Sequence, residues 1–136
     1  MADLTTQNRN NQQRSVCSSV GELLFSDITT AVSDTICKIP KGALVLGTRT
    51  NVITAFNAGT SITADIGIGG SATGIDDDLS IASTGVTAGT ASGVYYASGT
   101  DVTVVTTITG AVPTAGRLQI IVDYIETDKV SGNYVD

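Results

Sequence analysis

Hydrophobic and polar residues alternate most regularly between residues 43 and 68. From Ala43 to Phe56 the even positions are apolar or Thr, and the odd positions include Gly47, Arg49 and Asn51. Ser61 to Ile68 repeats the pattern, with Ile and Ala on one side and Ser, Thr, Asp and Gly on the other. A two-residue period is that of a strand with one buried face. Because a short loop containing Gly59 separates the two stretches, we predict a β-hairpin.

A second pair of alternating stretches runs over Asp101 to Thr109 and Arg117 to Glu126. The later stretch also has Ile121 and Ile125 on its opposite side, so it is apolar on both sides over part of its length. We therefore expect it to be central to the fold or to press against another subunit. The core predicted from the two pairs consists of Leu44, Leu46, Val52, Phe56, Ile62, Ile66, Val102, Val104, Leu118, Ile120 and Val122.

Other parts of the chain give weaker patterns. Residues 15–25 combine a helix-start signal with Gly and Val that suit a strand, and we favour the strand. Residues 28–39 have extended spacing, and Pro40 removes a backbone donor, so this run should end there or lie at a sheet edge. Residues 69–74 are predicted to be a flexible loop, and residues 79–87 a short strand.

Tyr95 and Tyr96 are adjacent in a predicted extended segment, so their side chains must face opposite ways. One is then a core residue and the other an exposed aromatic. We take Tyr95 as a candidate contact residue for a partner.

The acidic triplet Asp76 to Asp78 raises the possibility of a calcium site, because hard cations take carboxylate oxygens. The triplet lacks the alternating spacing and the distant Glu of a calcium loop. We therefore predict a solvated loop there and no metal site.

Composition favours a single all-β domain over residues 15–126. The 136 residues are 41% hydrophobic but only 4% aromatic, and they are rich in Thr, Val, Ile, Ala and Gly. A chain of this length buries roughly two thirds of its unfolded surface, so it needs no disulfides to hold a core. The alternating segments and frequent Gly/Thr connections predict a jelly-roll-like β-sandwich of about eight short strands with extended terminal arms.

The residue inventory argues against enzymatic chemistry. There is no histidine, which excludes Ser-His-Asp and Cys-His machinery and the commonest transition-metal sites. Carboxylates on strands remain formally able to act as a pair, but carbohydrate sites usually add aromatic platforms that this chain lacks. Gly67 to Gly70 has no Lys in phosphate-loop register. Cys17 and Cys37 are expected to be reduced, buried apolar residues. We expect no catalysis and no cofactor.

Charge is unevenly distributed along the chain. The net charge is −6, with +1 in residues 1–49 and −7 in residues 50–136. An acidic body repels phosphate, so we expect no nucleic-acid partner. No apolar run approaches a membrane span, and residues 1–14 lack the hydrophobic centre of a signal peptide, so we expect a soluble protein made in a cytoplasm.

The two ends of the chain differ from the body. Residues 1–14 are rich in Asn, Gln and Thr and cannot bury enough surface to fold alone, so we predict a flexible arm. Residues 127–136 are a polar tail with three apolar positions. The residues of these ends that we expect to contact a partner are Arg9, Arg14, Val130, Tyr134 and Val135.

The central block resembles small virion structural proteins of tailed bacteriophages. The residues that carry the resemblance are IPKGALVLG followed by N-x-x-T-A-F, then TADIGIG, and the closing strand AGRLQIIVDYI, within residues 36–126. The chain looks like a head cement, or decoration, protein.

The resemblance implies a non-enzymatic jelly-roll-like protein on the outside of the virion capsid. Such a protein would bind the major capsid protein, bridge capsomers, be assembled in the host cytoplasm and form a homo-oligomer, a dimer or a trimer. The alternative is a glycan- or receptor-binding module of a phage tail or fibre. That module would need an exposed aromatic such as Tyr95 or Tyr96 beside the Asp76 to Asp78 segment.

Overall fold

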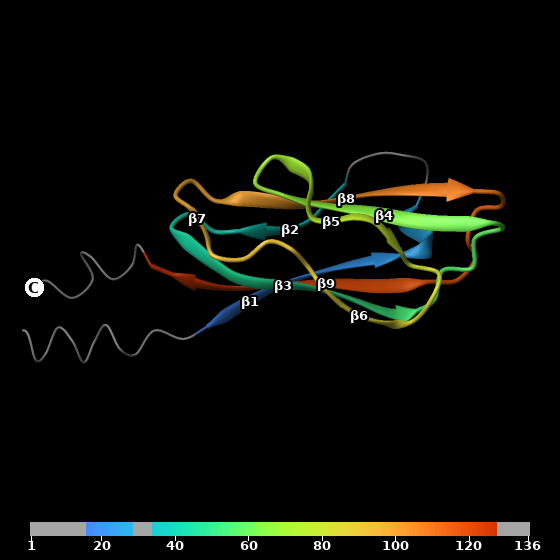
Figure 1. Ribbon diagram of the computed structural model, residues 1–136, viewed down its shortest axis with the longest axis horizontal. Coiled ribbons are helices and arrows are strands. Elements are labelled where there is room, and N and C mark those ends of the chain that lie inside the picture. Colours follow the sequence, from blue (N-terminus) through green and yellow to red (C-terminus); the bar gives the residue numbers. More distant parts are fainter. Residues whose placement is uncertain (1–15, 29–33, 128–136) are drawn as a thin grey trace, which may run out of the picture.

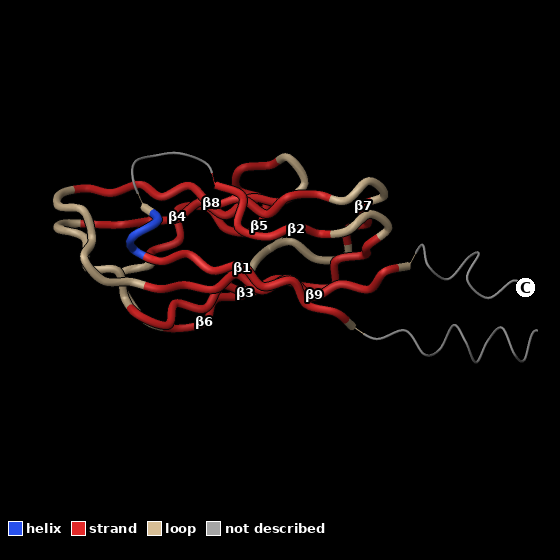
Figure 2. The backbone as a smooth tube through the Cα atoms, turned by 180° about the vertical axis from the view of Figure 1, so that it is seen from behind, coloured by secondary structure: helices blue, strands red, loops and turns tan. Residues whose placement is uncertain are grey.

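Two antiparallel β-sheets packed face to face make up the described part of the chain (Figures 1 and 2). The computed structural model describes residues 16–28 and 34–127. Sheet A has the order β1 (Cys17–Leu24), β9 (Arg117–Glu126), β3 (Ala43–Thr54) and β6 (Gly85–Ala88), and short β7 (Val94–Tyr96) also pairs with β3. Sheet B has the order β2 (Asp34–Ile39), β8 (Thr100–Thr109), β4 (Ser61–Ile68) and β5 (Ser71–Ser80). A single 3-10 turn, η1 (Phe25–Asp27), follows β1.

The strand pairs are nested, which is the mark of a jelly roll. With β7 set aside, the first strand pairs with the last, β2 with β8, β3 with β6 and β4 with β5. Such nesting arises when one long antiparallel ribbon winds into two sheets. The predicted all-β, jelly-roll-like sandwich is therefore confirmed.

The hairpin predicted over residues 43–68 is wrong, and the second pair of predicted strands is not paired with each other either. β3 lies in sheet A and β4 in sheet B, and likewise β8 lies in sheet B and β9 in sheet A. In a wound ribbon most consecutive strands cross from one sheet to the other, so alternation identifies the strands but not their partners. The crossing is fixed by Asn57, whose side-chain oxygen accepts the N–H groups of Thr114 and Ala115 at 2.8 Å each and ties the two crossing loops together.

The hairpin in the middle of the chain is instead β4–β5. Gly69 and Gly70 both have positive φ, 66° and 82°, which suits the tight turn between twisted strands. The predicted loop over 69–74 is therefore a two-residue turn followed by a strand. The acidic triplet likewise lies within β5 and not in a solvated loop; a bulge there places Asp78 at a φ of 52°.

A β-bulge in β3 overturns part of the predicted core. Its register against β9 shifts between Val45 and Gly47, which puts one extra residue on β3 and exchanges its two faces. Before the bulge Ala43 and Val45 are buried; after it Thr48, Thr50 and Val52 are buried. Leu46 is consequently exposed and Leu44 only half-buried, so both were wrongly predicted as core residues.

The other nine predicted core residues are buried. They are Val52, Phe56, Ile62, Ile66, Val102, Val104, Leu118, Ile120 and Val122. The core also contains residues that alternation did not single out, among them Val45, Ile75 and Ile81. The long apolar strand β9 is paired on both sides, with β1 and β3, as expected of a central strand.

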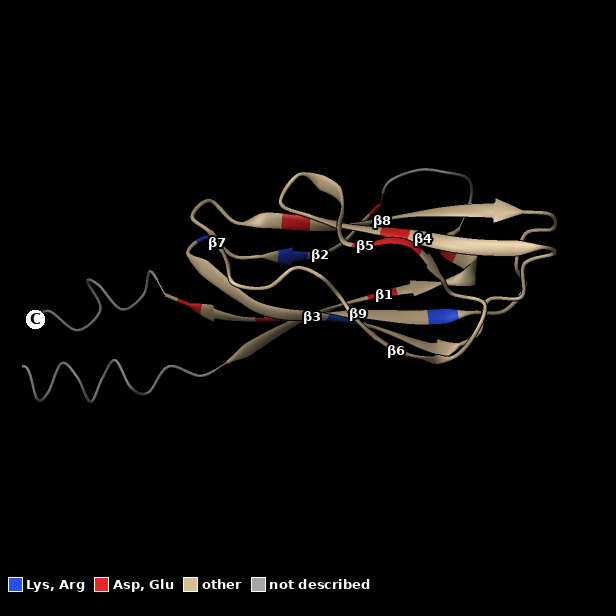
Figure 3. Cartoon of the chain, in the orientation of Figure 1, with Lys and Arg blue, Asp and Glu red and all other residues tan. Residues whose placement is uncertain are grey.

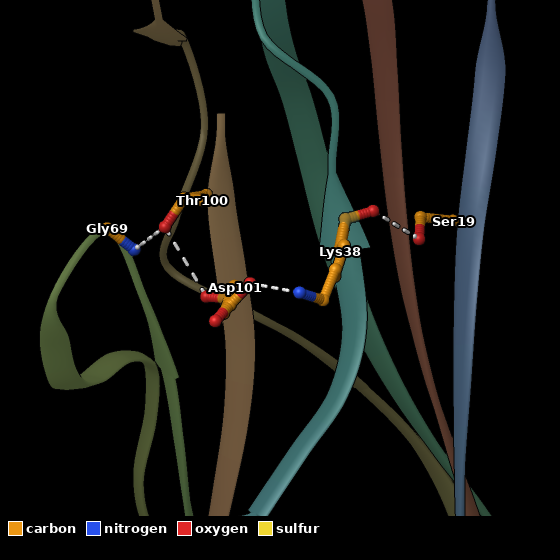
Figure 4. Close-up of polar contacts among 5 residues, drawn as sticks. All are labelled: Ser19, Lys38, Gly69, Thr100 and Asp101. Carbon is orange, nitrogen blue, oxygen red and sulfur yellow. Dashed lines mark hydrogen bonds and ion pairs between the residues drawn. The ribbon is translucent and has the colours of Figure 1, made fainter. Parts of the chain in front are cut away.

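Direct contacts between strands of different sheets hold one edge of the sandwich closed. A Cβ on Gly21 of β1 would lie 2.8 Å from the carbonyl oxygen of Ile36 on β2, so only glycine fits this approach. Two residues away, the Ser19 hydroxyl donates to the Lys38 carbonyl at 3.1 Å (Figure 4). The chain from 89 to 93 covers the opposite edge, where Gly89 N–H donates to Thr48 O and Thr90 N–H to Ile75 O.

The weaker expectations had mixed outcomes. Of the described residues 16–25, Cys17–Leu24 form the strand β1, as predicted. β2 ends at Ile39, before Pro40, at an edge of sheet B, which was also predicted. The predicted strand over 79–87 is wrong, because β5 ends at Ser80 and β6 begins at Gly85. Among the described residues no helix is long and apolar enough to cross a membrane.

Candidate interaction surface

The outward faces of the two sheets differ in chemistry. On sheet A six large apolar side chains point outward and are exposed: Val20, Leu24, Leu46, Ile53, Val86 and Tyr95. Leu44, Ile121 and Ile125 lie between them and are half-buried. In the described part of sheet B no large apolar side chain on a strand is exposed to this degree. We call the outward side of sheet A the apolar face.

The charges on the apolar face are paired with one another. The Arg49 guanidinium on β3 contacts the Asp123 carboxylate on β9, which also accepts a 2.7 Å hydrogen bond from the Ser18 hydroxyl on β1. Arg117 likewise contacts Glu22 across the β9–β1 pair. With two cations and two carboxylates among the described residues, this face has no formal net charge.

A shallow depression lies within the apolar face beside the β3 bulge. It is lined by Val16, Leu46, Gly47, Arg49, Gly89 and Asp123, among others, and measures about 420 Å³. A Cβ on Gly47 would meet nothing within 4 Å. Leu46 lines this depression because the bulge in β3 turns its side chain away from the core.

The outward side of sheet B is polar and acidic. Its carboxylates are those of Asp65, Asp77, Asp78 and Asp101, and its one ammonium is that of Lys38, 3.7 Å from Asp101 (Figures 3 and 4). Its other outward positions are mostly Thr and Ser. At the start of β8 the Thr100 hydroxyl accepts a 2.9 Å hydrogen bond from the Gly69 N–H (Figure 4). The formal charge of this side is therefore −3.

Three of its carboxylates converge at the β5 bulge. Oxygen atoms of Asp65, Asp77 and Asp78 lie within 4.8 Å of one another, and Asp65 also accepts the Asp78 N–H at 2.8 Å. Carboxylate oxygens are the ligands that calcium prefers, although exposed carboxylates gather in many proteins that bind no metal. The expectation of no metal site stays a prediction.

Asp76 of the triplet points elsewhere. The Thr50 hydroxyl of β3 donates to its Oδ2 at 3.0 Å, joining sheet B to sheet A. Burial raises the pKa of Asp76, and the hydrogen bond from Thr50 opposes that shift. Asp76 thus acts as a polar link across the sandwich.

The predicted contact residues fall in different places. Tyr95 is exposed on the apolar face opposite Leu44, and Tyr96 packs against the core, where burial raises its pKa. The remaining predicted contacts lie outside the described residues: Arg9, Arg14, Val130, Tyr134 and Val135. Tyr95 and the acidic cluster lie on opposite sheets, so the structure does not bring together the material of a glycan site.

The two cysteines lie on β1 and β2 and form no disulfide. Both are half-buried, and burial raises the pKa of the Cys37 thiol, opposed by a hydrogen bond with Ser19. A raised pKa keeps this thiol protonated and unreactive.

Sequence reasoning missed most of the apolar face. Only Tyr95, and the doubly apolar character of the strand with Ile121 and Ile125, pointed to it. Val86 lies in the four-residue strand β6, and Ile53 lies at a register shift of β3, so alternation alone does not assign their facing. The facing of Val20 follows from the pairing of β1 with β9.

Solved structures similar to this chain come from phage capsids, whereas no family model and no curated protein matches it. A chain of the cyanophage Pam1 capsid is 28% identical, with a TM-score of 0.67, over 82% of this chain and 85% of that one. A chain of the Ralstonia phage GP4 capsid is 18% identical (TM-score 0.57, covering 84% of each), and one of the Helicobacter pylori bacteriophage KHP30 capsid 14% identical (TM-score 0.58, covering 83% and 91%).

Proposed function

We propose that this phage virion structural protein is a cement protein, which binds the outside of the major capsid lattice and bridges neighbouring capsomers. The observation that carries the proposal is the likeness to a chain of the Pam1 capsid over more than four fifths of both chains. A capsid-related structural role follows from the three neighbours together. We also propose that the protein has no enzymatic activity, in keeping with a sequence that contains no histidine.

The layout of the fold supports attachment through one end of the sandwich. β1 and β9 are antiparallel neighbours with Cys17 opposite Tyr124, so the described chain begins and ends at the same end, the left in Figure 1. Thr127 is held there by its N–H and hydroxyl, which donate to the Gly42 carbonyl at 2.8 and 3.1 Å. Residues 1–14 and the tail from 127 onward therefore start from one place.

These two segments supply the contacts in the proposal. Arg9 and Arg14 against Asp3 give residues 1–14 a formal charge of +1, while Val130, Tyr134 and Val135 give the tail apolar anchors. The sandwich acts as a rigid spacer, and the segments order against the capsid surface or a neighbouring subunit.

Such binding stabilises a shell by linkage. A protein that binds only the assembled shell adds about 2.7 kcal/mol per site at a free concentration a hundredfold above its Kd. Bridging two capsomers makes the second contact intramolecular, so weak individual contacts suffice. No catalytic residue is needed for this effect.

The test uses expanded phage heads that lack this protein, mixed with the purified full chain. We expect the chain to sediment with the heads at saturable stoichiometry and to raise the temperature at which they release DNA. A variant lacking residues 1–14 should bind more weakly, and bovine serum albumin at the same concentration serves as the control for trapping. If the chain stays in the supernatant and binds purified tails or glycans instead, the cement role is wrong and the tail or fibre alternative takes its place.

A further inference from the structure

We infer that the tail beyond Thr127, residues 128–136, folds back in the unbound chain onto an apolar row at its own end of sheet A. Five side chains on the outward side of the sheet make up this row: Val16, Leu44, Leu46, Tyr95 and Ile125. Val16, Leu46 and Tyr95 are 58%, 41% and 47% exposed, and the other two are half-buried. Exposed apolar clusters mark interaction sites in soluble proteins.

The register of the strands places the row across the width of the sheet at this end (Figure 1). Leu44 of β3 lies opposite Ile125 of β9 on one side and opposite Tyr95 of β7 on the other. The start of β1 comes beside Ile125 in the same register, which adds Val16. Val16 and Leu46 also line the same depression beside the β3 bulge. Three spacings of about 4.8 Å between neighbouring strands make the row about 14 Å wide.

The described chain leaves sheet A beside this row. Thr127 is fixed there by its N–H and hydroxyl, which donate to the Gly42 carbonyl at 2.8 and 3.1 Å. Gly42 is two residues before Leu44, which is about 7 Å along the extended chain. The seven residues from 128 to Tyr134 span about 23 Å when extended. The tail is therefore long enough to cross the row, even with a turn at the Ser-Gly-Asn sequence of residues 131–133.

The amino-acid sequence decides which of the two terminal segments fits. The tail has three apolar side chains among its nine residues: Val130, Tyr134 and Val135. The N-terminal segment starts at the same end of the sandwich, but residues 5–15, which are the ones next to Val16, are all polar or charged. That segment offers no large apolar side chain to bury against the row, whereas the tail does.

Charge and tethering favour the tail of the same chain over a separate molecule. The next outward residue of β9 beyond the row is Asp123, whose carboxylate already contacts Arg49 and accepts a hydrogen bond from Ser18. The docked tail therefore meets no unpaired charge there. A short tether also holds the tail near the row at an effective concentration in the mM range. A contact too weak to form between separate molecules is then populated within one chain.

The docked tail has a consequence for attachment, which, unlike the docking itself, rests on the cement role. Tyr134 and Val135 do not contact a capsid while they lie against the row. Binding to the shell through the tail therefore releases the row, and the apparent affinity is reduced by the fraction of chains whose tail is docked. The tail thus covers apolar side chains of the free protein until a partner displaces it.

The test compares two valines of equal exposure in the full chain. Val16 in the row and Val112 in the loop after β8 are each 58% exposed. Hydrogen exchange of the tail amides is measured by NMR on the ¹⁵N-labelled protein. Amides of residues 130–135 should exchange about tenfold more slowly in the wild type than in Val16→Glu, because the docked tail would bury the new carboxylate. Val112→Glu should exchange as slowly as the wild type. Leu46→Glu is a second variant in the row, used if Val16→Glu melts at a lower temperature than the wild type.

The outcomes separate the possible occupants. Slow tail exchange that Val16→Glu or Leu46→Glu abolishes and Val112→Glu does not, and that is equal at about 20 and 400 μM protein, supports the inference. Tail amides that exchange in the wild type at the rate of an unfolded peptide overturn it, as does slow exchange that both row variants leave unchanged. Protection that grows with protein concentration assigns the tail to the row of another molecule and also overturns it. These measurements use no phage heads, so a failure here leaves the cement role standing.

Discussion

Val45→Ala and Leu46→Ala form a pair of neighbouring substitutions that tests the β3 bulge. Simple alternation places Leu46 in the core and Val45 outside. The structure places Val45 inside at 0% exposure and Leu46 outside at 41%. The two readings therefore predict opposite orders of destabilisation at adjacent positions.

The magnitude follows from what each substitution removes. Val45→Ala deletes two buried carbon groups at about 0.8 kcal/mol each, and the residual cavity brings the expected loss to about 2–3 kcal/mol. Leu46→Ala deletes three carbons, but these are partly exposed to water. The loss of unfolding free energy should therefore stay below about 1 kcal/mol, and most of it should come from the lower β-propensity of Ala. The melting temperature of Val45→Ala should be roughly 6–15 °C lower than that of the wild type.

Urea unfolding followed by far-ultraviolet circular dichroism measures both losses. The protein should be kept below about 1 μM, so that contacts between molecules do not contribute to the measured stability. Equal m-values would confirm that the change lies in stability and not in the unfolded state. If Leu46→Ala costs as much as Val45→Ala or more, the bulge is absent and the faces of β3 are inverted.

Three further predictions follow from the contacts. Gly21→Ala should destabilise the fold by about 1–3 kcal/mol in the same assay, because its Cβ would meet the Ile36 carbonyl at 2.8 Å; an unchanged midpoint would show that the two sheets do not approach so closely. Burial raises the folded-state pKa of Asp76 above its ordinary 3.8, so its contribution to stability is full below that pH and is lost as pH rises through the folded pKa; Asp76→Asn should abolish this loss, and parallel stability-pH curves for the two proteins would contradict it. Deleting residues 1–14 should leave the melting temperature of the isolated protein nearly unchanged while weakening head binding; a deletion that unfolds the monomer would make this segment an integral part of the fold.

Alternation along the sequence identified the long strands but could not assign their partners. The even positions from Thr48 to Val52 in β3 and the predicted core positions of β4, β8 and β9 were correct, because a period of two reports local facing directly. Pairing is a long-range property, and in a wound ribbon the strands next to each other in the chain mostly lie in different sheets. The expectation of a hairpin over residues 43–68 applied a local rule to a connection that crosses the sandwich.

The interaction surface was less predictable still, for a physical reason. A bulge adds one residue to β3 and reverses its faces, and no residue type between Val45 and Gly47 demands it. Leu46 therefore looked like a core residue until its partner strand was known. The side of the sheet on which Val20 and Val86 lie is known only once β1 and β6 are placed at the two edges of sheet A.

The most direct measurement of the central claim is a cryo-electron microscopy reconstruction of heads that lack this protein, before and after incubation with the full chain. The account predicts new density for a two-sheet sandwich on the outside of the shell, repeated at equivalent sites between capsomers, with the end that contains Val16 and Thr127 toward the capsid. Unchanged outer density at saturating concentration, or density confined to the tail, would contradict it.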